Sequence, residues 1–390
     1  MSAVPIIHLD RLRDGALHPI GEKVRRGERL SAVDAITLFR TPDLLGVGHL
    51  ADAVNRAKHG DVVTFASNQH INPTNVCVLR KTCVFCGYAR LPKEEGAYRY
   101  SIEQVLAEAA QASDSMTREF HIVGGLDMQA GLEYYTTMFR ALKAAHPLVH
   151  IKALTAVEIA HIGRIEKMSW TDVLIALREA GLDTMPGGGA ETFSAAVRDV
   201  IADRKLGGAD YIGVHRAAHA LGIRSNCTML YGHVETIEDR VEHLTMLRDL
   251  QDETGGFLAY IPLAYHPDDN ALGVTLGRQG TSTTGFDDLR NLAVGRLYLD
   301  NFQHIKSHWI MVSTALTQIA LAFGVNDIEG TVVREKIYHA VGAQTQQGMS
   351  LQELLRLIRG AGKEPAERDS FYRVIRTFEA APAAVVGAAA

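Results

Sequence analysis

Short apolar segments alternate with longer segments of helical periodicity from about residue 60 to residue 330. The short segments have the length of buried strands, and the longer ones repeat apolar residues at helical spacing. Strands that alternate with helices form parallel sheets, and eight such units are typical of an α/β fold of the TIM type, a (β/α)8 barrel. The expected strands are NVCVL near 75, FHIVG near 120, HIKAL near 150, LDTMP near 182, IRSNCTML near 223, FLAYIPLA near 257, HIKSHWIMV near 304 and a weak strand near Gly324.

The pattern also divides the chain into three parts. Residues 1–60 carry the helical patterns AVDAITLFR and LLGVGHLADAVNRAK, so we expect an N-terminal helical extension that could cover the barrel as a lid. The barrel should occupy residues 61–345, and this range begins with the short strand DVVTFASN, which precedes the alternating units. Residues 346–390 should form C-terminal helices and a flexible tail, because the final APAAVVGAAA is of low complexity.

Composition narrows the classes of protein. A chain of 390 residues that is 47% hydrophobic can bury a large core. Its net charge of -5 gives no basic field for a nucleic-acid backbone, so we expect no nucleic-acid partner. There is no signal-like N-terminus and no apolar run of roughly 18 residues, which predicts a cytoplasmic protein without a membrane partner.

Three of the four cysteines lie within ten residues, with the spacing C-x5-C-x2-C at Cys77, Cys83 and Cys86. We expect them at the end of the first barrel strand, where such barrels carry their chemistry. A structural zinc ion would need a fourth ligand, an iron-sulfur cluster on three thiolates would keep one iron open, and buried cysteines could simply pack as apolar residues. The polar residues 80–82 between the thiols favour the cluster, and Cys227 is expected to be a packed thiol.

Polar residues and glycines follow several of the other expected strands. Because the carboxyl ends of parallel strands meet at one mouth of a barrel, these residues should lie together. Glu191 and Arg198 are seven residues apart and are expected on one helix face, and Thr155 has the position of a helix cap. The candidates at the strand ends are Gly124, Gly125, Lys152, Thr155, Glu191, Arg198, Thr228, Tyr231, His233, His266 and Lys306.

The cysteine segment resembles the cluster loop of radical S-adenosylmethionine (SAM) enzymes, whose usual form is C-x3-C-x2-C with an aromatic residue before the last cysteine. Phe85 has that place here, although the first interval is two residues longer. The resemblance implies a 4Fe-4S cluster on the three cysteines and SAM as the second cofactor. It also implies cofactor-binding roles for Phe85, Gly124, Gly125, Thr155, Glu191 and Arg198.

Over residues 60 to 345, the chain resembles the aminodeoxyfutalosine synthase family of radical SAM enzymes in segments such as MPGGGAETF, PLAYHP and LDNFQHIKSHWI. That resemblance implies a transferase of the futalosine pathway of menaquinone biosynthesis. A 5'-deoxyadenosyl radical from SAM would add to 3-[(1-carboxyvinyl)oxy]benzoate, with rearrangement and decarboxylation, to give 6-amino-6-deoxyfutalosine. An electron donor such as flavodoxin or ferredoxin would be the protein partner.

The substrate implied by this resemblance carries two carboxylates, which cations and histidines should meet. The substrate-binding candidates are Lys152, Thr228, Tyr231, His233, His266 and Lys306. Because the carbon-carbon bond would be formed by a radical, we expect no catalytic acid-base pair. The alternatives are a sibling radical SAM enzyme, either dehypoxanthine futalosine cyclase or an FO synthase subunit, and a zinc-stabilised barrel without enzymatic activity.

Overall fold

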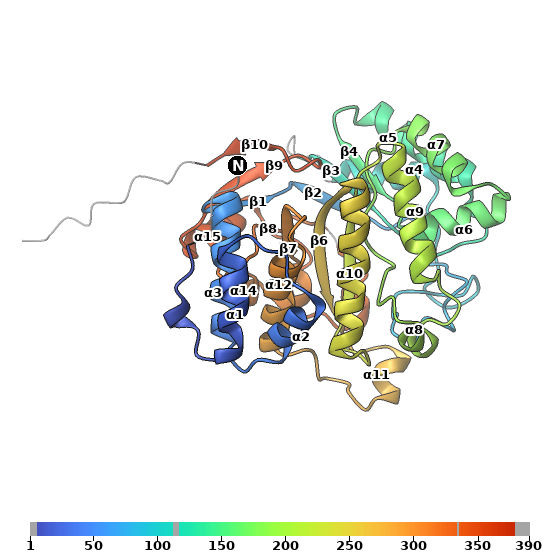
Figure 1. Ribbon diagram of the computed structural model, residues 1–390. Helices are drawn as coiled ribbons and strands as arrows, with labels where there is room; N and C mark the ends of the chain where they lie inside the picture. Colours follow the sequence, from blue (N-terminus) through green and yellow to red (C-terminus); the bar gives the residue numbers. More distant parts are fainter. Residues whose placement is uncertain (1–5, 112–116, 334, 379–390) are drawn as a thin grey trace, which may run out of the picture.

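The computed structural model describes residues 6–111, 117–333 and 335–378, and Figure 1 shows strands with helices around them and with β9 and β10 at the edge of the molecule. The strands are β1 Val62–Phe65, β2 Asn68–Ile71, β3 Glu119–Ile122, β4 His150–Ala153, β5 Ser225–Tyr231, β6 Phe257–Ala264, β7 His304–Ser307, β8 Asp327–Ile328, β9 Glu364–Arg368 and β10 Val374–Thr377. The helices are α1 His18–Arg25, α2 Ala32–Arg40, α3 Leu44–His59, α4 Ile102–Gln111, α5 Leu132–Ala145, α6 Ala156–Glu166, α7 Trp170–Ala180, α8 Ala195–Ile201, α9 Gly208–Ala220, α10 Ile237–Thr254, α11 Ala271–Thr275, α12 Gly285–Tyr298, α13 Trp309–Val312, α14 Thr314–Ala320 and α15 Leu351–Gly360.

The strands form two sheets that together make a barrel. One sheet has the order β2-β3-β4 and the other the order β10-β9-β1-β8-β7-β6-β5. Thr184 pairs in parallel with Lys152 of β4, and Met185 pairs in parallel with Ser225 of β5, so two residues fill the fourth strand position. On the opposite side, Thr331 Oγ1 accepts a hydrogen bond from Asn68 N (3.1 Å) and donates one to Asn68 O (3.0 Å). The predicted parallel barrel is therefore confirmed.

The first barrel strand is not the one expected. NVCVL lies in a loop that starts after Ile71, and the strand is the more polar NQHI of β2. Within the loop, Cys77 N donates to Arg90 O (2.9 Å), and Arg80 N donates to Cys77 O (3.2 Å), so the backbone folds back on itself. The apolar residues of NVCVL led to the wrong strand being predicted. The true strand β2 is polar because Asn68 and His70 face the interior of the barrel. The strand expected at HIKSHWIMV ends at Ser307, and the weak eighth strand begins at Asp327, after Gly324.

The N-terminal extension packs beside the barrel. Helix α3 contacts α12, and α2 contacts both α10 and α12, as Figure 1 also shows. Arg290 of α12 donates hydrogen bonds to the carbonyl oxygens of Phe39 (2.9 Å) and Thr41 (2.6 Å) at the end of α2. The hypothesis of an N-terminal lid is therefore wrong for the described residues of this extension.

As far as residue 378, the C-terminal segment contains one helix, α15, followed by two strands where only helices were expected. Strand β9 pairs in parallel with β1, and β10 pairs antiparallel with β9. The sequence of β9, EPAER, has no apolar strand pattern. Its Glu367 and Arg368 are nevertheless buried, because they bond to the polar partners Ser67 and Asp327. The predicted tail APAAVVGAAA lies outside the described residues.

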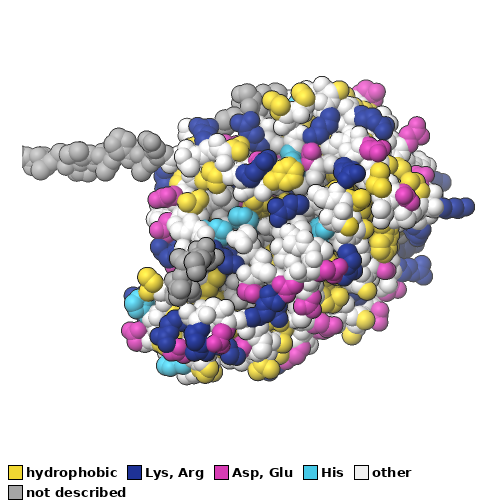
Figure 2. Space-filling model, turned by 45° about the horizontal axis from the view of Figure 1, so that its top comes forward, with side chains coloured by type: hydrophobic (Ala, Val, Ile, Leu, Met, Phe, Trp, Pro, Cys, Tyr) yellow, Lys and Arg dark blue, Asp and Glu magenta, His cyan; other side chains and the backbone are white. Residues whose placement is uncertain are grey.

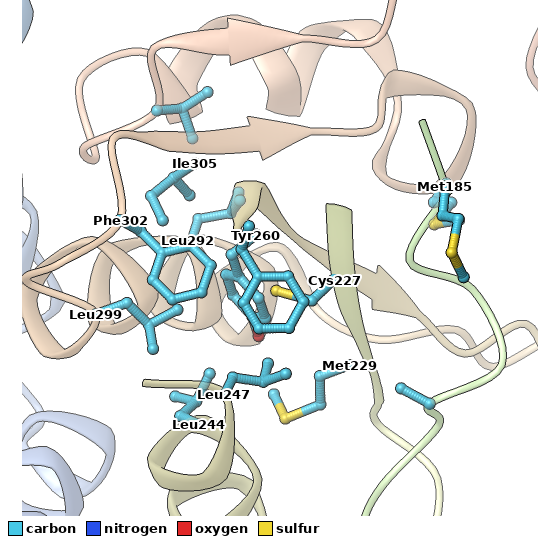
Figure 3. Packing of buried hydrophobic residues seen from close by; sticks show 14 of the residues in the cluster. Met185, Cys227, Met229, Leu244, Leu247, Tyr260, Leu292, Leu299, Phe302 and Ile305 are labelled. Carbon is cyan, nitrogen blue, oxygen red and sulfur yellow. The ribbon is translucent and has the colours of Figure 1, made fainter. Parts of the chain in front are cut away.

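The apolar core lies between the sheet and the surrounding helices. Figure 3 shows part of it, where Cys227 of β5 lies beside Tyr260, its register partner on β6. On the surface shown in Figure 2, Lys and Arg are interspersed with Asp and Glu. Within the described part of the chain, no helix combines the length and the apolar character needed to cross a membrane.

Candidate active site

A cavity of about 280 Å³ lies among the loops that follow the barrel strands and extends into the barrel. None of the described residues of the N-terminal extension lines it, whereas Ile337 and Tyr338 of the segment after β8 do. Of the residues predicted from sequence, the cavity brings together Cys77, Cys83, Phe85, Cys86, Gly124, Gly125, Lys152, Thr155, Glu191, Thr228 and Lys306.

The cysteine loop, residues 72–90, is held by backbone hydrogen bonds on both sides of the thiols. Val78 N donates to Leu126 O (3.0 Å), which joins the loop to the segment after β3. Cys83 N donates to Leu79 O (2.9 Å), and Cys86 N donates to Cys83 O (3.1 Å), so the last two cysteines lie on successive turns. The loop thus directs three thiols to one end of the cavity.

The environment of Cys77 and Cys83 disfavours the charged form of these two thiols unless a cation is present. Burial raises the pKa of Cys83 to about 12 and also raises the pKa of Cys77. Lys205 opposes this effect at both thiols. Its Nζ lies 5.4 Å from the ring centroid of Phe85. Lys205 was not predicted from the sequence, because it lies beyond the helix that follows the glycine run and belongs to no motif.

The positions of the possible metal ligands distinguish a structural zinc ion from an iron-sulfur cluster. Among the described residues, no group of three or more His, Cys, Asp and Glu side chains is arranged around the position of a single metal ion. A structural zinc ion needs four such donors at bonding distance, and Cys227 is buried in the core, where its thiol donates to Ala259 O. In a 4Fe-4S cluster each thiolate binds a different iron, so three separate thiols at one cavity end fit the cluster.

The glycine pair after β3 allows the cysteine loop to approach closely. A Cβ atom on Gly125 would lie 2.2 Å from Val76 O, and one on Gly124 would lie 2.8 Å from Thr74 O. Gly125 N also donates to Thr74 O at 2.9 Å. Any larger residue at these positions would displace the loop, so the pair sets the position of the cavity wall.

Thr155 is the N-cap of α6, as its position in the sequence indicates, and it also lines the cavity. Glu158 completes the capping box by accepting a hydrogen bond from Thr155 N (2.7 Å), and its second oxygen accepts one from Gly124 N (2.9 Å). Burial raises the pKa of Glu158 to about 7 despite these hydrogen bonds. One carboxyl group therefore connects the ends of β3 and β4.

Glu191 and Arg198 do not share a helix face, contrary to expectation. Glu191 lies in the loop before α8 with a φ of 50°, and its carboxylate forms an ion pair with Lys205. Arg198 lies on α8 outside the cavity lining, where it donates to Ala190 O (2.8 Å) and Thr192 O (3.2 Å). The spacing of seven residues gave a wrong prediction because Arg198 lies in a helix and Glu191 does not.

Three substrate candidates lie outside the cavity lining, so their predicted contacts are not supported. Tyr231 donates to Asp288 Oδ1 (2.7 Å) in the core. The His233 ring contacts Leu230 O at 3.1 Å, and the His266 ring contacts Met311 O at 3.1 Å. Each is a buried or partly buried polar side chain with a partner within the protein, which its position after a strand did not reveal.

The two candidate lysines line the cavity, but both are already paired with carboxylates. Lys152 Nζ donates to Glu119 Oε2 (2.7 Å). Lys306 Nζ donates to Glu329 Oε2 (3.1 Å) and lies 3.4 Å from Asp327. The lysine charges lower the pKa of Glu119 and Glu329. Thus ion pairs compensate the charges of both candidate lysines.

Several cavity residues were not predicted. His70 and His121 are at neighbouring register positions on β2 and β3, and His308 follows β7. The strand NQHI was not recognised, and the histidine of FHIVG was treated as part of an apolar strand. An alternating pattern in both segments, with every second residue facing the barrel interior, is the signal that could have found them.

Comparison with known proteins agrees with this geometry. The chain matches the radical SAM superfamily over residues 71–247 and the CofH/MqnC C-terminal region over residues 254–381. It is 45% identical to aminodeoxyfutalosine synthase of Thermus thermophilus, over 94% of this chain and 98% of the relative. It is 42% identical to aminodeoxyfutalosine synthase of Streptomyces coelicolor, over 94% of this chain and 95% of the relative.

Related enzymes match at lower identity. Cyclic dehypoxanthine futalosine synthase of Streptomyces coelicolor is 35% identical, over 91% of this chain and 88% of the relative. In structure, the chain is similar to methylornithine synthase, with a TM-score of 0.71 and 17% identity over 89% of this chain and 97% of that one, which supports the fold alone. The chain is therefore a radical SAM enzyme and belongs, within that superfamily, to the group that includes the aminodeoxyfutalosine synthases.

Proposed function

We propose that this enzyme is an aminodeoxyfutalosine synthase. It would join the 5'-deoxyadenosyl group of SAM to 3-[(1-carboxyvinyl)oxy]benzoate and, after rearrangement and decarboxylation, release 6-amino-6-deoxyfutalosine. The observation that carries the proposal is the 45% identity to a synthase over 94% of the chain, compared with 35% for the cyclic dehypoxanthine futalosine synthase. The cavity with three thiols at one end supports it.

Cys77, Cys83 and Cys86 would hold a 4Fe-4S cluster. When bound, the cluster and SAM supply the one-electron chemistry that generates a 5'-deoxyadenosyl radical. Lys205 would help to keep Cys77 and Cys83 in their charged, ligating form, because its charge opposes the effect of burial at both thiols. A one-electron donor such as flavodoxin or ferredoxin would serve as the protein partner.

The walls of the cavity near the thiols would bind SAM. Phe85, Gly124, Gly125, Thr155 and Glu191 all face this region. The glycines leave backbone groups accessible to the ligand, and Glu191 can accept hydrogen bonds from ligand donors. Arg198 would act indirectly, since its guanidinium holds the carbonyl oxygens on both sides of Glu191.

The remainder of the cavity would hold the benzoate substrate beside the ion pairs of Lys152 and Lys306, with Thr228 on the wall. Tyr338 and Ile337 also line the cavity, so the segment after β8 would help to exclude water from the reacting groups. The protein would thus orient the reactants and shield them from side reactions, without a residue that transfers a proton.

The cluster assignment is tested with the four cysteines. Single substitutions Cys77→Ala, Cys83→Ala and Cys86→Ala should each reduce bound iron and remove the visible absorbance of the anaerobically reconstituted protein. Cys227→Ala is the matched control and should keep both, because Cys227 lies in the core. A Cys83→Ala protein that retains full iron and absorbance would overturn the cluster assignment.

The reaction is tested by anaerobic incubation of the reduced wild-type protein with SAM and 3-[(1-carboxyvinyl)oxy]benzoate, followed by mass spectrometry. The synthase predicts a product that contains both the adenosyl group and the benzoate ring. Release of 5'-deoxyadenosine with unchanged benzoate would instead assign the protein to a sibling activity.

A further inference from the structure

Two of the histidines that line the cavity each have a ring nitrogen without a hydrogen-bond partner among the described residues. Nε2 of His70 and Nδ1 of His308 are buried, and neither has a partner among the described residues. Both rings line the cavity. Leaving such groups unpaired in a folded protein is costly, which indicates that a ligand supplies the missing partner.

Strand register places the ring of His70 inside the barrel, whereas His308 directly follows β7. His70 pairs with His121 across β2 and β3, and His121 pairs with Lys152 across β3 and β4, so the three side chains form one row inside the barrel. The rings of His70 and His121 are stacked with centroids 4.6 Å apart. The cysteine loop follows the carboxyl end of β2, whereas the row lies within the strands, so the row is further inside the barrel than the loop.

Among the described residues, the lysines that line the cavity are committed to ion pairs, whereas His70 Nε2 and His308 Nδ1 have no partner. The described lysines that line the cavity, Lys152, Lys205 and Lys306, are each ion-paired with a glutamate. Burial lowers the pKa of His70, and lowers the pKa of His308 to about 4, so both rings are neutral near pH 7. A neutral imidazole still has one N-H group to donate to an anion.

We propose that His70 and His308 form a subsite that binds the carboxylate on the benzoate ring of the substrate, with His121 stacked behind His70. This inference rests on the proposed function. In 3-[(1-carboxyvinyl)oxy]benzoate, the vinyl group must face SAM at the thiol end of the cavity because its carbon forms the new bond. The ring carboxylate is remote from that vinyl carbon, and it therefore points toward the histidine row.

Equilibrium binding tests the subsite without turnover. Isothermal titration calorimetry of the cluster-loaded but unreduced protein measures the Kd of the substrate. His70→Phe and His308→Phe keep an aromatic ring but remove the donor, and each should weaken binding by about ten- to a hundredfold, the usual effect of a hydrogen bond to a charged group. His70→Gln and His308→Asn place an amide near the lost nitrogen and should restore part of the affinity.

Two controls separate binding from a structural role. His146→Phe, at the end of α5 and outside the cavity lining, should leave the Kd unchanged. An analogue with a carboxamide in place of the ring carboxylate should bind the wild-type protein weakly and lose little further affinity in His70→Phe. If one variant does not fold, the other variant and the analogue on wild-type protein still test the subsite.

The outcomes distinguish this subsite from the proposed function. Unchanged substrate affinity in both phenylalanine variants, or an equal loss for acid and amide, would overturn the subsite even if the wild-type enzyme forms the adenosylated product. Wild-type protein that binds the substrate through these histidines but forms no such product would overturn the function and keep the subsite. Wild-type protein that does not bind the substrate would overturn both.

Discussion

Glu158 both caps a helix and helps to position the wall of the candidate SAM site. It caps α6 together with Thr155 and accepts a hydrogen bond from Gly124 N, which is part of the cavity wall. Desolvation dominates its environment and raises its pKa to about 7 from an ordinary value of 4.5. The carboxyl group therefore gains or loses its proton near neutral pH, and the helix cap changes with it.

This shift predicts a pH-dependent difference in stability between the wild-type protein and Glu158→Gln. Between about pH 4.5 and 7 the folded protein retains a proton that the unfolded chain has lost, so wild-type stability falls as pH rises through this window. Relative to Glu158→Gln, which does not titrate, the free energy of unfolding should fall by up to about 1.4 kcal/mol per pH unit and then level off. Urea unfolding from pH 5 to pH 8 measures it, and parallel curves would refute the shift.

At the scale of secondary-structure elements, the contact between the cysteine loop and the segment after β3 determines where the thiols lie. Gly125 is the closest point, because a Cβ there would lie 2.2 Å from Val76 O and 2.7 Å from Val76 C. Neither atom can move without moving the loop backbone. The loop is thus positioned by the absence of a side chain on a neighbouring element.

Gly125→Ala should therefore reduce the iron bound per protein after reconstitution by at least about half, while the protein remains folded. The expected cause is displacement of the loop, since inserting a methyl group into a packed contact costs about 1–3 kcal/mol. Gly207→Ala is the control, because no atom lies within 4 Å of its added Cβ. Equal iron content in the two variants, with matching circular dichroism, would show that the contact does not position the thiols.

The elements also show what the sequence can and cannot predict. Alternation of apolar strands with amphipathic helices was sufficient for the barrel, and cysteine spacing was sufficient for three residues of the cavity. Strand β2 was missed because its polar residues Asn68 and His70 face the interior, and β9 was missed because Arg368 is buried through an ion pair with Asp327. Hydropathy reports burial of apolar groups, whereas these strands bury paired or ligand-facing polar groups. Lys205 was missed because a tertiary contact, not sequence spacing, joins it to Glu191.

At the scale of the whole molecule, a chain of buried ion pairs connects the C-terminal segment to the cavity. Arg368 of β9 forms two hydrogen bonds with Asp327, at 2.6 and 2.9 Å. Asp327 also lies 3.4 Å from Lys306, which pairs with Glu329 on the cavity wall. The C-terminal strands therefore support the charge balance of the barrel interior as well as extending its sheet.

Arg368→Met should destabilise the protein by about 3–5 kcal/mol, since it leaves Asp327 buried with an incomplete set of partners. Arg373→Met is the matched control, because the Arg373 side chain is 74% exposed and pairs with Asp369 at the surface. That variant should lose less than about 1 kcal/mol. Urea unfolding of both proteins measures the difference, and similar losses would show that the buried pair does not stabilise the fold.

The central claim, that the adenosyl group of SAM becomes part of the product, is tested most directly with an isotope. SAM labelled with ¹³C at the 5' carbon is incubated anaerobically with the reduced enzyme and 3-[(1-carboxyvinyl)oxy]benzoate, and the labelled molecules are identified by mass spectrometry and ¹³C NMR. We predict that the label appears in 6-amino-6-deoxyfutalosine, at the carbon that forms the new carbon-carbon bond. Label found only in 5'-deoxyadenosine, with the benzoate unchanged, would contradict the account.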